Sequence, residues 1–241
     1  MGKINRILRF ISFVSSLVYL MTVRAQPYGL SYAVKGTCVA AIAMIVFRTL
    51  RDREGRMLGA SLLFSSLGDV LLGIDPEKLF TFGLGSFLIA HLLYIALFLL
   101  NLKRPVMLGA ARLILLAFVI ASGLVLTIWL WPGFGSLALP VVLYIVVITT
   151  MAVTSLTAGF KTPAIAVGAM LFMVSDSLIA IGKFKRPFAY GAYLVWAFYY
   201  VGQYCIAMGF VREKIVHQAV KAKKFNPAVR KTKALGAEEL S

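Results

Sequence analysis

Four ionisable side chains interrupt the long apolar segments of this 241-residue chain: Lys35, Asp69, His91 and Asp176. Two carboxyl groups at one site can divide acid–base work, because one donates a proton while the other stays ionised and stabilises a cation. Lys35 lies five residues after the start of one apolar run, and Asp69 and Asp176 each lie five residues before the end of another. In helices these three charges are therefore expected at one depth, about 7–8 Å from the same end.

The helical surroundings of the two aspartates differ. Residues three and four positions earlier share a face with a given helical residue. Before Asp69 both positions are serines, one of them Ser66, whereas before Asp176 they are Met173 and Phe172. Hydroxyl groups stabilise an ionised carboxylate, and apolar neighbours favour the protonated acid. This difference predicts that Asp176 is the proton donor and Asp69 the carboxylate that faces the cation and water.

Other polar side chains within the apolar segments could contact a substrate. His91 and Tyr94 lie one helical turn apart, as do Tyr200 and Gln203. A lone histidine in such a segment either bonds a neighbouring helix or carries a proton, and the tyrosines and Gln203 either pack or bind a ligand. The candidate substrate-binding residues are Lys35, His91, Tyr94, Tyr19, Tyr200, Gln203 and Ser66.

Several familiar catalytic motifs are missing from the sequence. It contains no G-x-S-x-G, no H-E-x-x-H, no phosphate-binding P-loop and no Cys/His cluster. Both cysteines, Cys38 and Cys205, fall inside apolar runs and are expected to be small buried hydrophobic residues. These features count against a serine hydrolase, a zinc protease and a nucleotide-binding enzyme, and we expect neither a metal nor another cofactor.

The composition places these residues in a membrane protein. Hydrophobic residues make up 61% of the chain and charged residues 14%, and the mean hydropathy is +0.89. A soluble domain has about 25% charged residues and could not hide this much apolar surface from water. The excess is gathered in runs long enough to cross a hydrocarbon core about 30 Å thick. The expected fold class is all-α, in an integral multi-pass membrane protein.

Eight spans are predicted, and they divide into two halves of four. The spans are Leu8–Val23, Leu30–Phe47, Met57–Ile74, Leu79–Leu100, Gly109–Trp131, Leu137–Leu156, Pro163–Ile181 and Phe188–Val211. Aligning Asp69 with Asp176 reveals a weak internal repeat between the third span of each half. We expect a single membrane domain over residues 1–211, with halves of about 1–104 and 105–211 that bring the two aspartate helices together, and a basic cytoplasmic tail over 212–241.

The charge distribution predicts the orientation. The net charge is +16, and 19 of the 25 Lys and Arg residues flank the spans on the side of the N-terminus, against five on the other side. By the positive-inside rule both termini are cytoplasmic, in a bacterial cytoplasmic membrane or in the endoplasmic reticulum. Lys183, Lys185 and Arg186 run against this trend. The basic residues border membrane segments rather than forming a domain, so nucleic-acid binding is not expected.

These residues also carry a family resemblance that covers the whole membrane region. The chain resembles the YhhN-like transmembrane lysoplasmalogenases in Gly68-Asp69, Phe82-Gly83-Leu84, Ala90-His91-Leu92-Leu93-Tyr94, Ser175-Asp176-Ser177, Lys183-Phe184, Tyr199-Tyr200-x-x-Gln203, Tyr19 and Lys35. It departs from the family in one respect, since Lys35 is followed by Gly36-Thr37-Cys38 where a proline is usual.

The resemblance implies hydrolysis of the vinyl ether bond of a lysoplasmalogen, an alkenyl glycerophosphocholine or glycerophosphoethanolamine. The products are a fatty aldehyde and the glycerophospho-alcohol, and the implied partners are the lysophospholipid substrate and the lipid bilayer. Acid–base chemistry suffices, because protonating the vinyl ether β-carbon gives an oxocarbenium ion that water captures. The alternatives are a proton-coupled transporter of a small or amphiphilic solute and a structural membrane protein. The sequence does not predict the oligomeric state.

Overall fold

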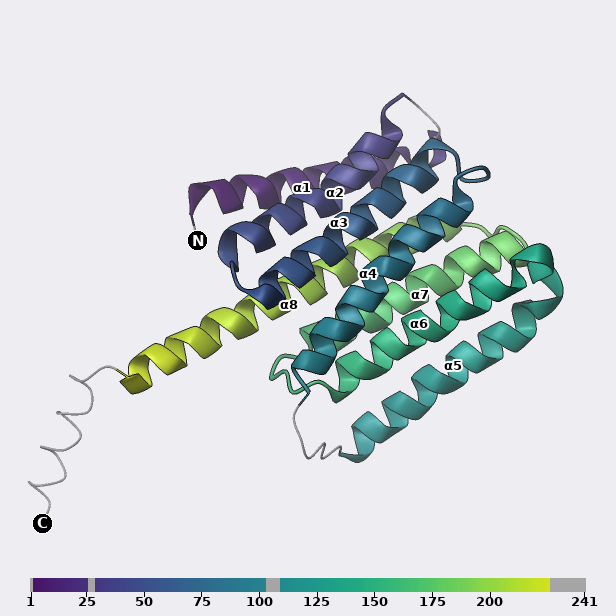
Figure 1. Cartoon of the computed structure of the whole chain (residues 1–241). Helices are drawn as coiled ribbons and strands as arrows, with labels where there is room; N and C mark the ends of the chain where they lie inside the picture. The colour runs from purple at the N-terminus through teal and green to yellow at the C-terminus, as the bar shows by residue number, and fades with distance from the viewer. Residues whose placement is uncertain (1, 26–28, 103–108, 226–241) are drawn as a thin grey trace, which may run out of the picture.

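The computed structural model describes residues 2–25, 29–102 and 109–225, which form eight α-helices and two short 3-10 turns and contain no β-strand (Figure 1). The helices are α1 (Lys3–Thr22), α2 (Ser31–Thr49), α3 (Arg53–Ile74), α4 (Phe80–Leu100), α5 (Ala110–Phe134), α6 (Ala138–Thr157), α7 (Ala164–Phe184) and α8 (Gly191–Phe225). The predicted all-α class is confirmed. The connections at Gln26–Pro27 and Lys103–Pro105, and the tail from residue 226 onward, lie outside the described residues.

Local hydrogen bonds fix where α3 begins and ends. The Asp52 carboxylate accepts a bond of 2.9 Å from the backbone N–H of Gly55 and so caps the first turn. At the other end the Asp75 carboxylate accepts bonds from the backbone N–H groups of Lys78 and Glu77, at 2.9 and 3.1 Å, and turns the chain toward α4. The two hydrogen bonds lower the pKa of the Asp75 carboxyl below its ordinary value, and the bond from the Lys78 N–H has the larger effect.

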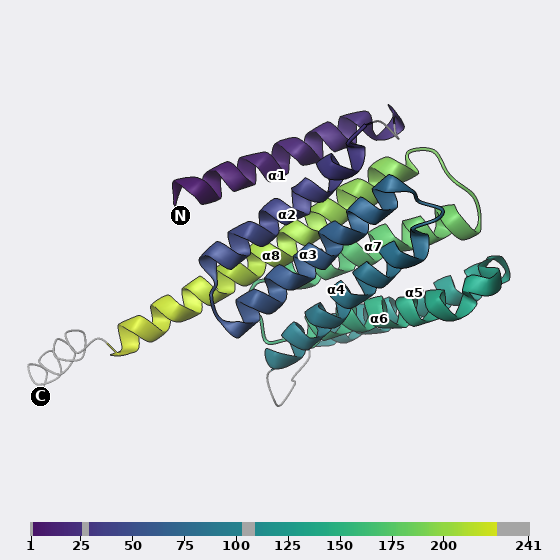
Figure 2. The same cartoon turned by 45° about the horizontal axis from the view of Figure 1, so that its top comes forward.

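Six helices form a closed ring. Around it, α2 packs on α3, α3 on α4, α4 on α6, α6 on α7, α7 on α8, and α8 on α2 (Figures 1 and 2). The other two helices lie outside the ring: α1 packs against α2 and α8, and α5 packs against α6 and α7. The ring therefore encloses the residues that its six helices direct inward.

The outer helices carry the apolar surface that a membrane requires. On α5, large side chains such as Ile114, Phe118 and Ile128 are about 70% exposed, and α1 exposes Phe10 and Met21 to a similar degree. Seven segments of the described chain are long and apolar enough to cross a membrane, with α5 and α6 counted in one continuous segment, Ala110–Thr157. The chain is a multi-pass helical membrane protein.

Two details differ from the sequence-based expectation. The helices that carry Asp69 and Asp176 do not pair with each other: α3 packs mainly on α2 and α4, and α7 packs mainly on α8. Each aspartate therefore takes its nearest partners from other helices. In addition, α8 continues past the predicted end at Val211 to Phe225, so the first part of the expected tail is helical.

The closest helix pair, α7 and α8, meets at two glycines. A methyl group added at Gly168 would lie 2.6 Å from the carbonyl oxygen of Gly202 and 2.9 Å from the backbone nitrogen of Ile206. Both atoms belong to the backbone of a packed helix and cannot rotate away. The absence of a side chain at Gly168 thus permits the contact that holds α7 against α8.

We predict that Gly168→Ala destabilises the folded protein by about 1–3 kcal/mol, because the added methyl group overpacks the helix interface. Gly85→Ala is the matched control, since Gly85 is also helical and an added methyl group there meets no atom within 4 Å. Thermal unfolding of the two variants in detergent tests this prediction. Equal midpoints for both variants would contradict it.

Candidate active site

Six polar side chains, one from each helix of the ring, gather inside the bundle: Lys35 of α2, Asp69 of α3, His91 of α4, Tyr144 of α6, Asp176 of α7 and Tyr199 of α8. They form two hydrogen-bonded groups, each built around one aspartate. Sequence reasoning named four of the six, and the two tyrosines complete the groups.

The first group is a buried ion pair with a tyrosine. The Nζ atom of Lys35 lies 3.3 Å from Oδ1 of Asp69, and the Tyr199 hydroxyl donates a 2.5 Å bond to Oδ2. The Asp69 side chain is 2% exposed and that of Lys35 16%. The ring of Tyr19 lies 5.9 Å from the lysine Nζ. Lys35 and Asp69, two of the three charges expected at one depth, thus meet as an ion pair inside the bundle.

The second group joins Asp176 to a tyrosine and a histidine. The Tyr144 hydroxyl donates a hydrogen bond to Oδ2 of Asp176. His91 Nε2 lies 2.9 Å from the Tyr144 hydroxyl oxygen and 3.4 Å from the same carboxylate oxygen. His91 is fully buried, and its Nδ1 atom has no hydrogen-bond partner among the described residues. Asp176 therefore has two neighbouring groups that can exchange or hold a proton.

Aromatic rings lie between the two groups. The Phe172 ring contacts both, with its centroid 4.7 Å from that of His91 and 5.1 Å from that of Tyr199. Phe87 packs edge-on against Phe172 and Tyr199. The two aspartates are thus held in separate polar groups across a shared aromatic layer.

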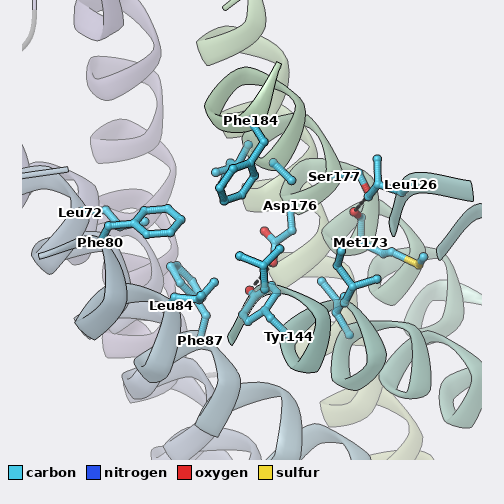
Figure 3. A pocket seen from close by; sticks show the side chains of 15 residues that line it. Leu72, Phe80, Leu84, Phe87, Leu126, Tyr144, Met173, Asp176, Ser177 and Phe184 are labelled. Atoms are coloured by element: carbon cyan, nitrogen blue, oxygen red, sulfur yellow. Dashed lines mark hydrogen bonds between the residues drawn. The ribbon is translucent and has the colours of Figure 1, made fainter. Parts of the chain in front are cut away.

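A pocket opens beside the second group (Figure 3). Its wall is mostly apolar and includes Leu72, Phe80, Leu84, Phe87, Met173 and Phe184. Asp176 is the one carboxylate among the described residues that line it, and Figure 3 shows this side chain between Phe184 and Tyr144, facing the open space. Of the two apolar neighbours predicted for Asp176, Met173 lines this pocket and Phe172 does not; Asp69 does not line it either.

The remaining predicted site residues lie in other contacts. The Tyr94 hydroxyl donates a 2.6 Å bond to Oε1 of Gln203. Tyr200 and Ser12 share a hydrogen bond of 3.0 Å between their hydroxyls. Ser66 donates to the backbone oxygen of Gly36 at 2.8 Å, so its hydroxyl joins α3 to α2 rather than bonding Asp69 as expected.

Tyr144 and Tyr199 are the residues that sequence reasoning left out of the site. Tyr144 is the sole tyrosine of its predicted span, and a polar tip in an apolar run was the available signal. Tyr199 belongs to the quoted Tyr199-Tyr200 motif, although its neighbour Tyr200 was selected instead. Only the rotation of α6 and α8 about their axes reveals which tyrosine faces an aspartate.

No group of three or more His, Cys, Asp and Glu side chains that could hold a metal ion occurs in the part of the chain that the structure describes.

The fold and the site define a class: a multi-pass helical membrane protein with carboxyl groups buried in its bundle, one of which faces an apolar pocket. A family model described as the YhhN family matches residues 30–210, and the chain belongs to that family. No solved structure matches the chain.

Three relatives illustrate the similarity. A lysoplasmalogenase from Mycobacterium bovis is 38% identical over 161 residues, which cover 66% of this chain and 61% of the relative. Lysoplasmalogenase TMEM86B from Sus scrofa is 33% identical over 187 residues, 76% of each chain. Lysoplasmalogenase TMEM86A from Bos taurus is 32% identical over 163 residues, 64% of each chain. The match thus spans about three fifths of the mycobacterial relative's length.

The buried ion pair generates a stability prediction. We expect Asp69→Asn to cost on the order of 3 kcal/mol, because it leaves the Lys35 ammonium without its partner inside the bundle. The double variant Lys35→Met/Asp69→Asn should recover much of that loss, since no charge is left unpaired. Thermal unfolding in detergent is measured for both single variants, Asp69→Asn and Lys35→Met, and for the double variant. Additive losses from the two substitutions would show that the pair is not coupled.

Proposed function

We propose that this protein hydrolyses the vinyl ether bond of lysoplasmalogens, alkenyl glycerophosphocholine or glycerophosphoethanolamine, to a fatty aldehyde and the glycerophospho-alcohol. The observation that carries the proposal is Asp176, a carboxyl group bonded by Tyr144 and facing an apolar pocket inside a membrane protein. The names of the relatives support the same reaction. The pocket provides an apolar surface for the alkenyl chain, and the carboxyl group provides the acid.

The reaction needs one proton delivered and one returned. Protonated Asp176 donates its proton to the β-carbon of the vinyl ether, and the neighbouring carbon becomes an oxocarbenium ion beside the new carboxylate. Water adds to that carbon while the Asp176 carboxylate takes up the water's proton. The hemiacetal then collapses: the carbon–oxygen bond to glycerol breaks, the aldehyde forms, and the glycerol oxygen receives the hemiacetal proton. The net change is the consumption of one water.

The neighbouring groups take different roles in this proposal. Tyr144 and His91 keep the Asp176 carboxyl oriented toward the pocket, and the hydroxyl of Tyr144, which lines the pocket, also binds the attacking water. Asp69, ionised by its contacts with Lys35 and Tyr199, supplies negative charge from across the aromatic layer as the cation develops. Because Asp69 does not line the pocket, it acts at a distance and touches neither the substrate nor the water.

Detergent-purified protein should release aldehyde from an alkenyl lysophospholipid without any sealed compartment. Release under these conditions excludes a protein that only transports its solute. A purified, folded protein that releases no aldehyde from either headgroup class would contradict the proposed function.

Asp176→Asn should lower turnover by about 10²- to 10⁴-fold while leaving the protein folded, because the amide cannot donate the catalytic proton. Asp176→Glu should keep more activity than Asp176→Asn, since it retains a carboxyl group. Asp75→Asn is the matched control, because Asp75 lies outside the bundle interior and an amide oxygen can still accept its backbone bonds. Wild-type turnover in Asp176→Asn would remove this residue from the mechanism.

We further propose eight membrane crossings in two four-helix halves, with both termini cytoplasmic. Two observations support an even number of crossings: α5 and α6 run in opposite directions, and α1 begins at the end of the bundle where α8 ends (Figures 1 and 2). The excess of Lys and Arg at that end supports its cytoplasmic side.

Cysteine labelling tests this orientation in a background where Cys38 and Cys205 are replaced by serine. A cysteine at Lys78, whose side chain is 87% exposed, should react with an impermeant reagent added outside intact cells. A cysteine at Arg53, at the opposite end of α3, should react only after permeabilisation. The reverse pattern would contradict the proposed orientation and would place the pocket in the opposite leaflet of the membrane.

A further inference from the structure

An exposed lysine, Lys183, contacts one wall residue of the pocket beside Asp176 without lining the pocket itself. Lys183 follows Asp176 by seven residues on α7, which places it about 10 Å farther along the axis on nearly the same helical face. Its Nζ atom lies 4.4 Å from the centroid of the Phe80 ring, and Phe80 is part of the pocket wall. The ammonium group is therefore held against a residue of the pocket wall.

This lysine has no structural partner of opposite charge. None of the ion pairs in the described part of the chain includes Lys183, whereas the cations inside the bundle and at its other end, Lys35 and Lys214, are each paired with a carboxylate. Lys183 also belongs to the three basic residues that run against the charge rule for membrane orientation. Neither the membrane orientation of the chain nor an ion pair therefore accounts for a positive charge at Lys183.

We propose that Lys183 binds the phosphodiester of the lysoplasmalogen headgroup and so sets the depth at which the vinyl ether meets Asp176. This inference rests on the proposed function and adds a specificity-determining residue to it. The ligand class is a single-chain glycerophospholipid whose phosphate lies at the Phe80 end of the pocket and whose chain occupies the apolar wall.

The spacing suits this arrangement. In a glycerophospholipid, three glycerol carbons and one ester oxygen separate the vinyl ether oxygen from phosphorus. That separation covers much of the axial distance between Asp176 and Lys183, and the flexible lysine side chain covers the remainder. A phosphate bound at the lysine then leaves the vinyl ether at the level of the carboxyl group. The cation–π contact with Phe80 limits where the ammonium can lie before substrate arrives.

The test compares ligands with and without the phosphate. Detergent-purified wild type and Lys183→Gln are assayed for the KM of an alkenyl glycerophosphoethanolamine. The inhibition constants of two saturated ethers are measured alongside, an alkyl glycerophosphoethanolamine and an alkylglycerol of equal chain length. We expect Lys183→Gln to raise the KM and the first inhibition constant about tenfold, as loss of a charged hydrogen bond does, with a much smaller change for the alkylglycerol. Lys183→Arg should keep the KM and the first inhibition constant close to their wild-type values, because it retains the positive charge.

Lys185→Gln is the matched control, because Lys185 lies two residues away and its Nζ sits over Trp129, at 5.5 Å, instead of over the pocket wall. Equal changes for both ethers in Lys183→Gln, or no change for either, would overturn the inference and leave the proposed function standing. Wild-type protein that releases no aldehyde would overturn the proposed function. In that case binding is measured instead, by letting each of the two ethers displace a bound fluorescent lysolipid. If Lys183→Gln weakens displacement by the alkyl glycerophosphoethanolamine more than displacement by the alkylglycerol, Lys183 recognises the phosphate.

Discussion

A carboxylate inside a helical membrane bundle must be paired, hydrogen-bonded or protonated, and the rest of this structure depends on meeting that requirement twice. Asp69 meets it with a cation and a tyrosine, and Asp176 meets it with a tyrosine and a histidine. The partners come from α2, α4, α6 and α8, so the two aspartates tie together every helix of the ring. The helices outside the ring bury few side chains and are left to face lipid.

The two aspartates differ in whether their carboxyl group borders an open space. Asp69 is enclosed by its partners, whereas Asp176 borders a pocket whose wall is almost entirely apolar. Asp176 can therefore reach a molecule bound in the pocket, whereas Asp69 can act on such a molecule only at a distance. The division of roles expected from the helical neighbours stays a prediction. Of the groups expected to support Asp69, Lys35 contacts it, whereas Ser66 bonds the backbone of α2 instead. The hydrogen bond from Tyr199 was not predicted from the sequence.

Position along a helix is predictable from this sequence, whereas rotation about the helix axis is not. Hydropathy places every helix, and counting residues from span ends brings Lys35 to the depth of Asp69. Which side of α6 or α8 faces inward depends on packing against distant helices, so Tyr144 could not be assigned from its own segment. The internal repeat led to pairing of α3 with α7, but such a repeat fixes direction and not neighbours.

The proposed hydrolysis needs a water molecule inside a pocket whose wall is mostly apolar, and the polar side chains of Tyr144 and Asp176 can supply the site for it. The oxocarbenium ion is consumed by water, yet a wall of Leu, Phe and Met side chains holds little of it. The hydroxyl of Tyr144 and the carboxylate of Asp176 are the polar atoms beside the point where that cation forms, and together they can bind one water in place. The two products then partition into different phases, because the aldehyde is apolar and enters the lipid whereas the glycerophospho-alcohol dissolves in water. The pocket extends from Asp176 to Phe80 and Phe184, the terminal residues of α4 and α7. At that end of the bundle the glycerophospho-alcohol can reach water while the aldehyde enters the lipid, so neither product crosses the hydrocarbon core.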